Sequence, residues 1–179
     1  MIEPESQLDL FDQLSYYEGA DVEYKSAKGG LPGSLWETYS AFANSNGGVI
    51  WLGVSQRDGR LVPSGVSEPE KLRADFWSAV NNRGKISANL LTEADVSIIR
   101  VPESGTHLIR IRVGRASRRQ RPVYVGPTPL GGTFRRNSEG DFRCTDEEVR
   151  RMFADSHDEP PDSRIVHGFS WSDLHAESI

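Results

Sequence analysis

The spacing of apolar residues in the first half of the chain predicts a helix followed closely by a buried strand. Leu35, Tyr39 and Phe42 recur at helical intervals, so we expect a helix over 34–45 with one apolar stripe. The polar and glycine residues at 44–48 tolerate the left-handed backbone of a helix end, and they predict that the helix stops there. The run at 49–54 is almost entirely apolar, as expected for a strand covered on both faces. Gly53 inside this run indicates a bulge or a close approach of another backbone.

Patterns elsewhere predict further helices and strands. Apolar residues at 8, 11 and 14 indicate a short amphipathic helix over 7–17, and the Asp-Gly pair at 58–59 predicts a hairpin turn. Three sequences have the form of a capping box, which predicts helix starts at Ser34, Ser67 and Thr145. The other expected elements are an extended segment at 22–25, helices at 67–82 and 145–154, strands at 96–101 and 108–113, and a strand pair at 122–125 and 133–136.

These elements predict an α+β fold, a single domain with a mixed β-sheet, packed helices and a C-terminal extension. The length of 179 residues favours one domain, which we place at 1–155. Residues 156–179 are polar and contain adjacent prolines, as is typical of a linker or tail. This segment leads to a further domain, or it packs back on the first one through Phe169 and Trp171.

Composition narrows the class of protein and its compartment. No apolar run approaches the roughly 18 residues that a membrane-spanning helix needs, so we expect no membrane association. The acidic N-terminus lacks the features of a signal peptide, which favours a cytoplasmic location. Cys144 is the only cysteine, which excludes an internal disulfide and a Cys-based zinc site. The phosphate-binding loop of P-loop ATPases is also absent from the sequence.

Charge is strongly segregated along the chain. The net charge is −5, yet residues 107–143 contain nine arginines and only two acids, Glu139 and Asp141. Arginine suits phosphate oxygens because its planar fork donates two parallel hydrogen bonds, so this stretch predicts a nucleic-acid contact surface. The alternative is a solvated loop whose arginines pair with the acidic helix after Thr145. The candidate nucleic-acid-binding residues are Arg110, Arg112, Arg115, Arg118, Arg119, Arg121, Arg135, Arg136 and Tyr124, and Phe134 and Phe142 are further aromatics able to stack on unpaired bases.

Several motifs resemble the AlbA-type domain of the Schlafen family. They are E-Y-K at 23–25, A-F-A-N-S-N-G-G at 41–48 with V-I-W-L-G-V directly after it, R-P-V-Y at 121–124 and T-F-R-R-N-S at 133–138. The resemblance covers roughly residues 18–154. It implies a Schlafen/AlbA-like fold and a nucleic-acid-binding module, for DNA or RNA, of a transcriptional regulator.

The resemblance also implies an alternative function as a metal-dependent endoribonuclease. In Schlafen ribonucleases two glutamates and a later aspartate form a three-carboxylate site, and such oxygen ligands suit Mg²⁺ or Mn²⁺. Glu18, Glu23 and Lys25 match the first part of that pattern and are the catalytic candidates. Gln56 stands where an acid is expected, and Asp58 lies two residues further on, so the candidate metal ligands are Glu18, Glu23 and Asp58.

A third alternative is a dimerisation or assembly domain of a larger protein. In animal Schlafens two such modules lie side by side around a groove. A chain with one copy would recreate that arrangement as a homodimer.

Overall fold

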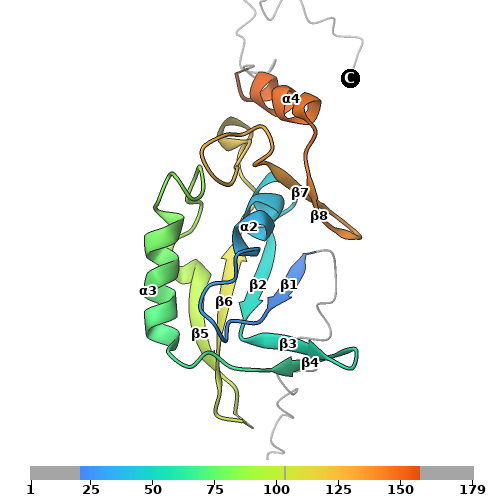
Figure 1. The fold of residues 1–179 in the computed structure, drawn as a ribbon. Helices are drawn as coiled ribbons and strands as arrows, with labels where there is room; N and C mark the ends of the chain where they lie inside the picture. The colour runs from blue at the N-terminus through green and yellow to red at the C-terminus, as the bar shows by residue number, and fades with distance from the viewer. Residues whose placement is uncertain (1–20, 103, 158–179) are drawn as a thin grey trace, which may run out of the picture.

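The computed structural model describes residues 21–102 and 104–157. Its elements form one four-stranded sheet with two helices packed on one face and two hairpins beside it (Figure 1). The helix expected at 7–17 lies outside the described residues. In chain order the elements are β1 (Val22–Lys25), α2 (Leu35–Asn44), β2 (Gly48–Leu52), β3 (Val54–Arg57), β4 (Arg60–Pro63), α3 (Pro69–Val80), the 3₁₀ turn η1 (Glu93–Asp95), β5 (Val96–Arg100), β6 (His107–Val113), the 3₁₀ turn η2 (Arg118–Gln120), β7 (Phe134–Asn137), β8 (Gly140–Arg143) and α4 (Asp146–His157).

The central sheet is mixed, as expected. Its four strands lie in the order β1-β2-β6-β5, with β1 parallel to β2 and the other neighbours antiparallel. Helix α2 makes the crossover that a parallel pair requires. Two separate hairpins, β3–β4 and β7–β8, flank this sheet, so the chain folds as an α+β domain.

Both faces of the sheet are buried at its centre. Ile50 and Ile111 are register partners on the face that packs against α2 and α3, where Tyr39 and Phe76 fill the core. Trp51 lies on the opposite face, in a second apolar cluster that includes residues of the β3–β4 hairpin. The apolar run at 49–54 therefore reflects burial on both sides, as its composition predicts.

Gly53 divides the predicted strand at 49–54 into two strands of different sheets. Its φ is +91°, and a side chain there would meet Val66 Cγ2 at 3.0 Å and the Gly65 carbonyl carbon at 3.1 Å. The predicted close approach is confirmed, but the single strand is wrong, because the chain turns at this residue and β3 pairs with β4. The predicted hairpin turn is also confirmed, with positive φ at Asp58 and Gly59.

Only one of the three predicted capping boxes forms. At α4 the Thr145 backbone N–H donates to Glu148 Oε2 at 2.8 Å, and the Glu148 N–H donates to Thr145 Oγ1 at 3.3 Å. Ser34 makes no cap hydrogen bond, because its backbone is helical (φ −72°, ψ −3°) where a capping residue is extended, and its hydroxyl accepts from Lys25 Nζ at 3.1 Å. The box at Ser67 is also absent, since α3 starts at Pro69 with Glu68 as its uncapped N-cap.

The predicted pairing of 122–125 with 133–136 is wrong in its extent. The two segments share only the bridge between Tyr124 and Thr133, and the main partner of β7 is β8. Hydrogen bonds from the Asn44 side chain connect these two segments in place of the predicted strand ladder. Its amide nitrogen donates to Val123 O at 2.7 Å and to Phe134 O at 3.0 Å, while its oxygen accepts from the Val123 N–H at 2.8 Å. The last residue of α2 thus fixes the start of β7 and the segment after the arginine stretch.

Helix α4 lies at one end of the molecule, beside η2 (Figure 1). The β3–β4 hairpin lies at the other end. Within residues 21–102 and 104–157, no helix combines the length and apolarity needed to cross a bilayer.

Candidate nucleic-acid interface

Strand β7 carries two arginines that are adjacent in sequence but face opposite sides. Side chains alternate along a strand, so Arg136 shares the inward face with Phe134, and Arg135 lies on the outward face. Phe134 is buried, and Arg135 is exposed to solvent. The two arginines therefore meet different partners.

Arg136 is held in a network of charged and aromatic partners. Its guanidinium donates to Asp141 Oδ1 at 2.8 Å, to Glu23 Oε2 at 3.0 Å and to the Val22 carbonyl at 3.0 Å. It also lies 4.9 Å from the centre of the Phe42 ring, and only 11% of its side chain is exposed. Burial opposes the charge of this group, but hydrogen bonds and attraction from Asp141 and Glu23 outweigh burial and raise the pKa of Arg136.

The acids of this network have further partners of their own. Glu23 Oε1 accepts a hydrogen bond from Lys25 Nζ at 3.1 Å, and Thr38 Oγ1 donates to Asp141 Oδ2 at 2.6 Å. Two acids are thus balanced by two bases across β1, β7 and β8. We call Glu23, Lys25, Arg136 and Asp141 the compensated network.

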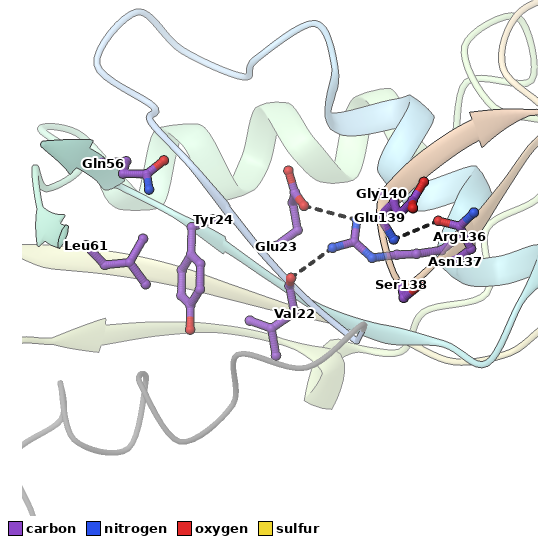
Figure 2. A pocket seen from close by; sticks show the side chains of 10 residues that line it. All are labelled: Val22, Glu23, Tyr24, Gln56, Leu61, Arg136, Asn137, Ser138, Glu139 and Gly140. Carbon is purple, nitrogen blue, oxygen red and sulfur yellow. Dashed lines mark hydrogen bonds and ion pairs between the residues drawn. The ribbon is translucent and has the colours of Figure 1, made fainter. Parts of the chain in front are cut away.

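Glu23 and Arg136 line a pocket of about 480 Å³ between β1, the β3–β4 hairpin and the β7–β8 turn. Figure 2 shows the two side chains pointing toward each other, with Gln56 at the far side of the pocket and the Tyr24 side chain directed away from Glu23. The remaining lining residues are Val22, Leu61, Asn137, Ser138, Glu139 and Gly140.

The predicted catalytic and metal-binding residues are placed only in part. Glu18 lies outside the described residues, and Asp58 is exposed on the β3–β4 turn. Gln56, on β3, lines the pocket with Glu23 at the position where an acid was expected. Its amide brings no negative charge. Within the described part of the chain no three His, Cys, Asp or Glu residues are grouped to hold a metal ion, so the Mg²⁺ or Mn²⁺ site stays a prediction.

The second group of arginines converges on Arg121. Burial lowers the pKa of Arg121, and the positive charges of Arg115, Arg135 and Arg118 lower it further, against an opposing effect of Asp155. The Arg121 Nε atom is buried and has no hydrogen-bond partner in the described structure. We call Arg115, Arg118, Arg121 and Arg135 the arginine cluster.

Local hydrogen bonds shape the segment that carries three of these arginines. The Ala116 N–H donates to Ala43 O at 2.8 Å, which ties the segment to the end of α2. Gln120 Oε1 accepts from the Ser117 N–H at 3.1 Å and from the Ser117 hydroxyl at 2.8 Å, which closes η2. This segment is therefore a hydrogen-bonded turn that presents Arg118 and Arg119 to solvent.

Helix α4 provides the acids nearest to the arginine cluster. Glu148 Oε1 lies 3.9 Å from Arg135 Nη1, and Asp155 is the acid that acts on Arg121. The pKa of the Glu148 carboxyl is lowered, first by the Thr145 backbone N–H and then by the Thr145 hydroxyl. The acidic helix thus pairs with one arginine of the stretch, as the alternative interpretation of the sequence predicts.

Of the other predicted nucleic-acid contacts, Arg119 is next to this cluster, and Arg110, Arg112 and Tyr124 lie away from it. Arg110 and Arg112 are on the sheet face opposite α2, and Arg112 Nε lies 3.3 Å from Asp95 Oδ1. Tyr124 is half-buried beside Ser87, which accepts its backbone N–H. Arg119 is exposed on η2 next to the cluster.

Some side-chain contacts of the site are not apparent from local sequence patterns. Asp141 and Thr38 complete the compensated network, and Asn44 positions both arginine-bearing segments. The Asn-Ser-Glu-Gly sequence at 137–140 is a turn signal that would have indicated the β7–β8 hairpin, and with it the Arg136–Asp141 pair. No comparable local signal exists for Asn44. Burial raises the pKa of the Cys144 thiol to about 11, so Cys144 is a packing residue at neutral pH.

A comparison with protein-family models matches residues 18–145 to the Schlafen AlbA_2 family. The chain belongs to this family. The matched range holds the compensated network and the whole arginine cluster. A comparison with curated proteins finds no match.

Among solved structures, the chain is similar to the N-terminal domain of a protein from Nitrosomonas europaea that is named as related to the ATP-dependent DNA helicase RecG. The sequences are 31% identical, the TM-score is 0.55, and the match covers 76% of this chain and 92% of the other. The fold and the family thus agree with a domain that has a role related to nucleic acids.

Proposed function

We propose that this domain binds nucleic acid through the phosphate backbone, with the arginine cluster as the main contact. The observation that carries the proposal is that η2 and Arg135 both lie against α4, which brings arginines of two separate segments to one end of the molecule. Arg115, Arg118 and Arg121 come from the segment around η2, and Arg135 comes from β7. Among the described residues, the carboxylates of Glu148 and Asp155 act on the group.

Like charges repel, so such a cluster is favoured when an anion binds between them. Phosphate oxygens are well matched to guanidinium groups, and contacts of this kind position a backbone without reading base sequence. The family and the relation of the structural neighbour to a DNA helicase support nucleic acid as the source of the phosphates. Arg119 extends the same surface.

Arg136 has a different role in this proposal. Its guanidinium already donates to two carboxylates and a carbonyl, so it stabilises the fold beneath the cluster rather than contacting phosphate. Arg112 is likewise paired with Asp95. The binding surface therefore covers fewer arginines than the charged stretch contains.

The test is fluorescence anisotropy with labelled DNA and RNA at increasing salt. We expect binding at low salt, about 50 mM, and a linear fall of log affinity with log salt, with a slope near −0.9 per phosphate neutralised on duplex DNA. The double variant Arg118→Gln with Arg135→Gln should weaken binding and reduce that slope by about two.

The matched control removes the same charge from the other end of the molecule. Arg57 and Arg60 are both exposed on the β3–β4 hairpin, which lies away from α4 in Figure 1. Arg57→Gln with Arg60→Gln should leave affinity and slope unchanged. Equal effects of the two double variants, or no binding of DNA or RNA to the wild-type protein at low salt, would overturn the proposal.

A further inference from the structure

The outward face of the β7–β8 hairpin combines a cluster arginine with an exposed aromatic ring. Arg135 and Phe142 are direct register partners in this antiparallel pair, so their side chains lie on the same face, with Cβ atoms roughly 5 Å apart. The Phe142 side chain is 46% exposed. On the inward face, the partners are Arg136 with Asp141 and Phe134 with Arg143.

The three aromatics of the charged stretch differ in whether they can reach a ligand. Phe134 is only 7% exposed and lies beneath the Arg143 guanidinium, 5.5 Å from its ring centre. Tyr124 is half-buried. Phe142 belongs to neither apolar core cluster of the described structure, so its ring is open to solvent on the same face as Arg135. Phe153 on α4 is also exposed, at 38%, but it lies outside the charged stretch.

Exposure alone would not assign a function to Phe142, because single exposed apolar residues are common on protein surfaces. Leu130 has a similar exposure, 44%, in the loop before β7. Phe142 differs from Leu130 because it is aromatic and because its strand partner belongs to the arginine cluster. When a phosphate of a bound nucleic acid contacts Arg135, the base next to that phosphate lies within reach of the Phe142 ring.

We propose that Phe142 stacks on an unpaired base and that this surface therefore prefers single-stranded or looped nucleic acid to duplex. The inference rests on the proposed function and adds the class of ligand. In a duplex the base faces are covered by neighbouring bases, whereas an unpaired base can turn outward and stack on an aromatic side chain. The phosphate contacts of the cluster serve both forms of nucleic acid, so the preference comes from the ring.

The experiment compares a fluorescein-labelled single strand of about 15 nucleotides with the same sequence as a duplex. Phe142→Leu keeps an apolar side chain but removes the ring. It should weaken binding to the single strand about tenfold, within the range for loss of one stacked base, and leave duplex binding unchanged. Phe142→Trp should retain single-strand affinity, and Leu130→Ala is the control for loss of exposed apolar surface.

A second measurement identifies stacking as the cause. An abasic site keeps the phosphates but removes the base, so scanning one along the single strand should reveal one position that weakens binding to the wild-type protein about tenfold. That position should have little effect on the Phe142→Leu variant, because a shared contact is lost only once. If every abasic site weakened binding of Phe142→Leu as much as binding of the wild-type protein, the inference would be overturned.

The outcomes separate this inference from the proposed function. Equal loss for single strand and duplex in Phe142→Leu, or no loss for either, contradicts stacking while the arginine double variant still reports on the cluster. Failure of the wild-type protein to bind either probe at low salt overturns both proposals. Urea unfolding of Phe142→Leu confirms that the exposed site leaves the fold intact.

Discussion

Arg135 and Arg136 are neighbours in sequence with opposite surroundings, and the difference shows how one residue type serves structure and binding in the same strand. Arg136 is almost enclosed, with Glu23 and Asp141 as partners. Arg135 is exposed, near the charges of Arg121 and of one acid, Glu148. The period of two in a β-strand is sufficient to produce this contrast.

The contrast also separates two types of charged region. In the compensated network each charge has an opposite partner at hydrogen-bond distance, so little electrostatic attraction remains for a ligand. In the arginine cluster the like charges act on one another and the acids of α4 offset them only in part. A high density of arginine in sequence therefore does not by itself identify a binding surface.

Breaking the compensated network should produce the largest effect. Arg136→Met leaves Glu23 and Asp141 without their shared partner in a largely buried position, and we expect a loss of about 3 kcal/mol in the free energy of unfolding. Urea unfolding measures this loss. Arg135→Met is the control and should change stability by less than about 1 kcal/mol, as an exposed pair does. Similar losses in the two variants would contradict the contrast.

Removing the residue that anchors both regions should have the next largest effect. Asn44 is 1% exposed, and Asn44→Ala removes the partner of the buried Val123 N–H and the Asn44 bond to the Phe134 carbonyl, while the Val123 carbonyl keeps the bond from Ser40 Oγ. We expect a loss of about 2 kcal/mol, the penalty for buried polar groups left unsatisfied. The exposed Asn46 provides the matched control, and Asn46→Ala should stay within about 0.5 kcal/mol of wild type in the same urea titration.

Acid should weaken the cap of α4. The pKa of Glu148 is lower in the folded protein than its ordinary value of 4.5, so its contribution to stability is complete above that value and is lost as pH falls through the folded value. We expect the wild-type protein to be more stable than Glu148→Gln at about pH 6 and this difference to shrink toward about pH 3. Urea unfolding of both proteins across this range checks it, and a constant difference would be inconsistent with the lowered pKa.

The smallest expected effect is on binding. Glu148→Gln removes an acid that lies 3.9 Å from Arg135, so affinity for nucleic acid at low salt should rise about twofold. The pair is roughly half exposed, which limits the gain, and high salt should abolish it. Anisotropy titrations of the two proteins at low and high salt measure the difference. A fall in affinity would show that Glu148 supports the cluster instead of competing with the ligand.

Sequence patterns were sufficient for the family, for the α+β class and for most helices and strands, because apolar spacing reflects burial directly. The Thr145 box formed although Arg135 lies 3.9 Å from the other oxygen of Glu148, whereas Ser34 has a helical backbone and its hydroxyl accepts from Lys25. Pro69 set the start of α3 later than the box at Ser67 predicts. Local motifs of this kind are reliable only where tertiary contacts leave them intact.

The pairing within the site was less accessible to sequence reasoning. Glu23 bonds to a residue 113 positions away, and Asn44 to residues 79 and 90 positions away, so no window along the chain contains both partners. Alternation in the strand predicted at 133–136 separates Arg135 from Arg136, but only the burial of Phe134 shows which of the two faces inward.

The bond between Glu23 and Arg136 also has a consequence for how the domain forms. It joins the first described strand to the seventh, so the chain must have brought nearly all of its intervening elements together before this contact can be made. Contacts with such long sequence separation are associated with slow folding, because closing the loop lowers the entropy of the chain before the contact contributes any stabilisation. During synthesis Glu23 emerges more than a hundred residues before its partner. The β7–β8 hairpin therefore depends on a long-range closure for its position, and so does Arg135 on the surface proposed to bind nucleic acid.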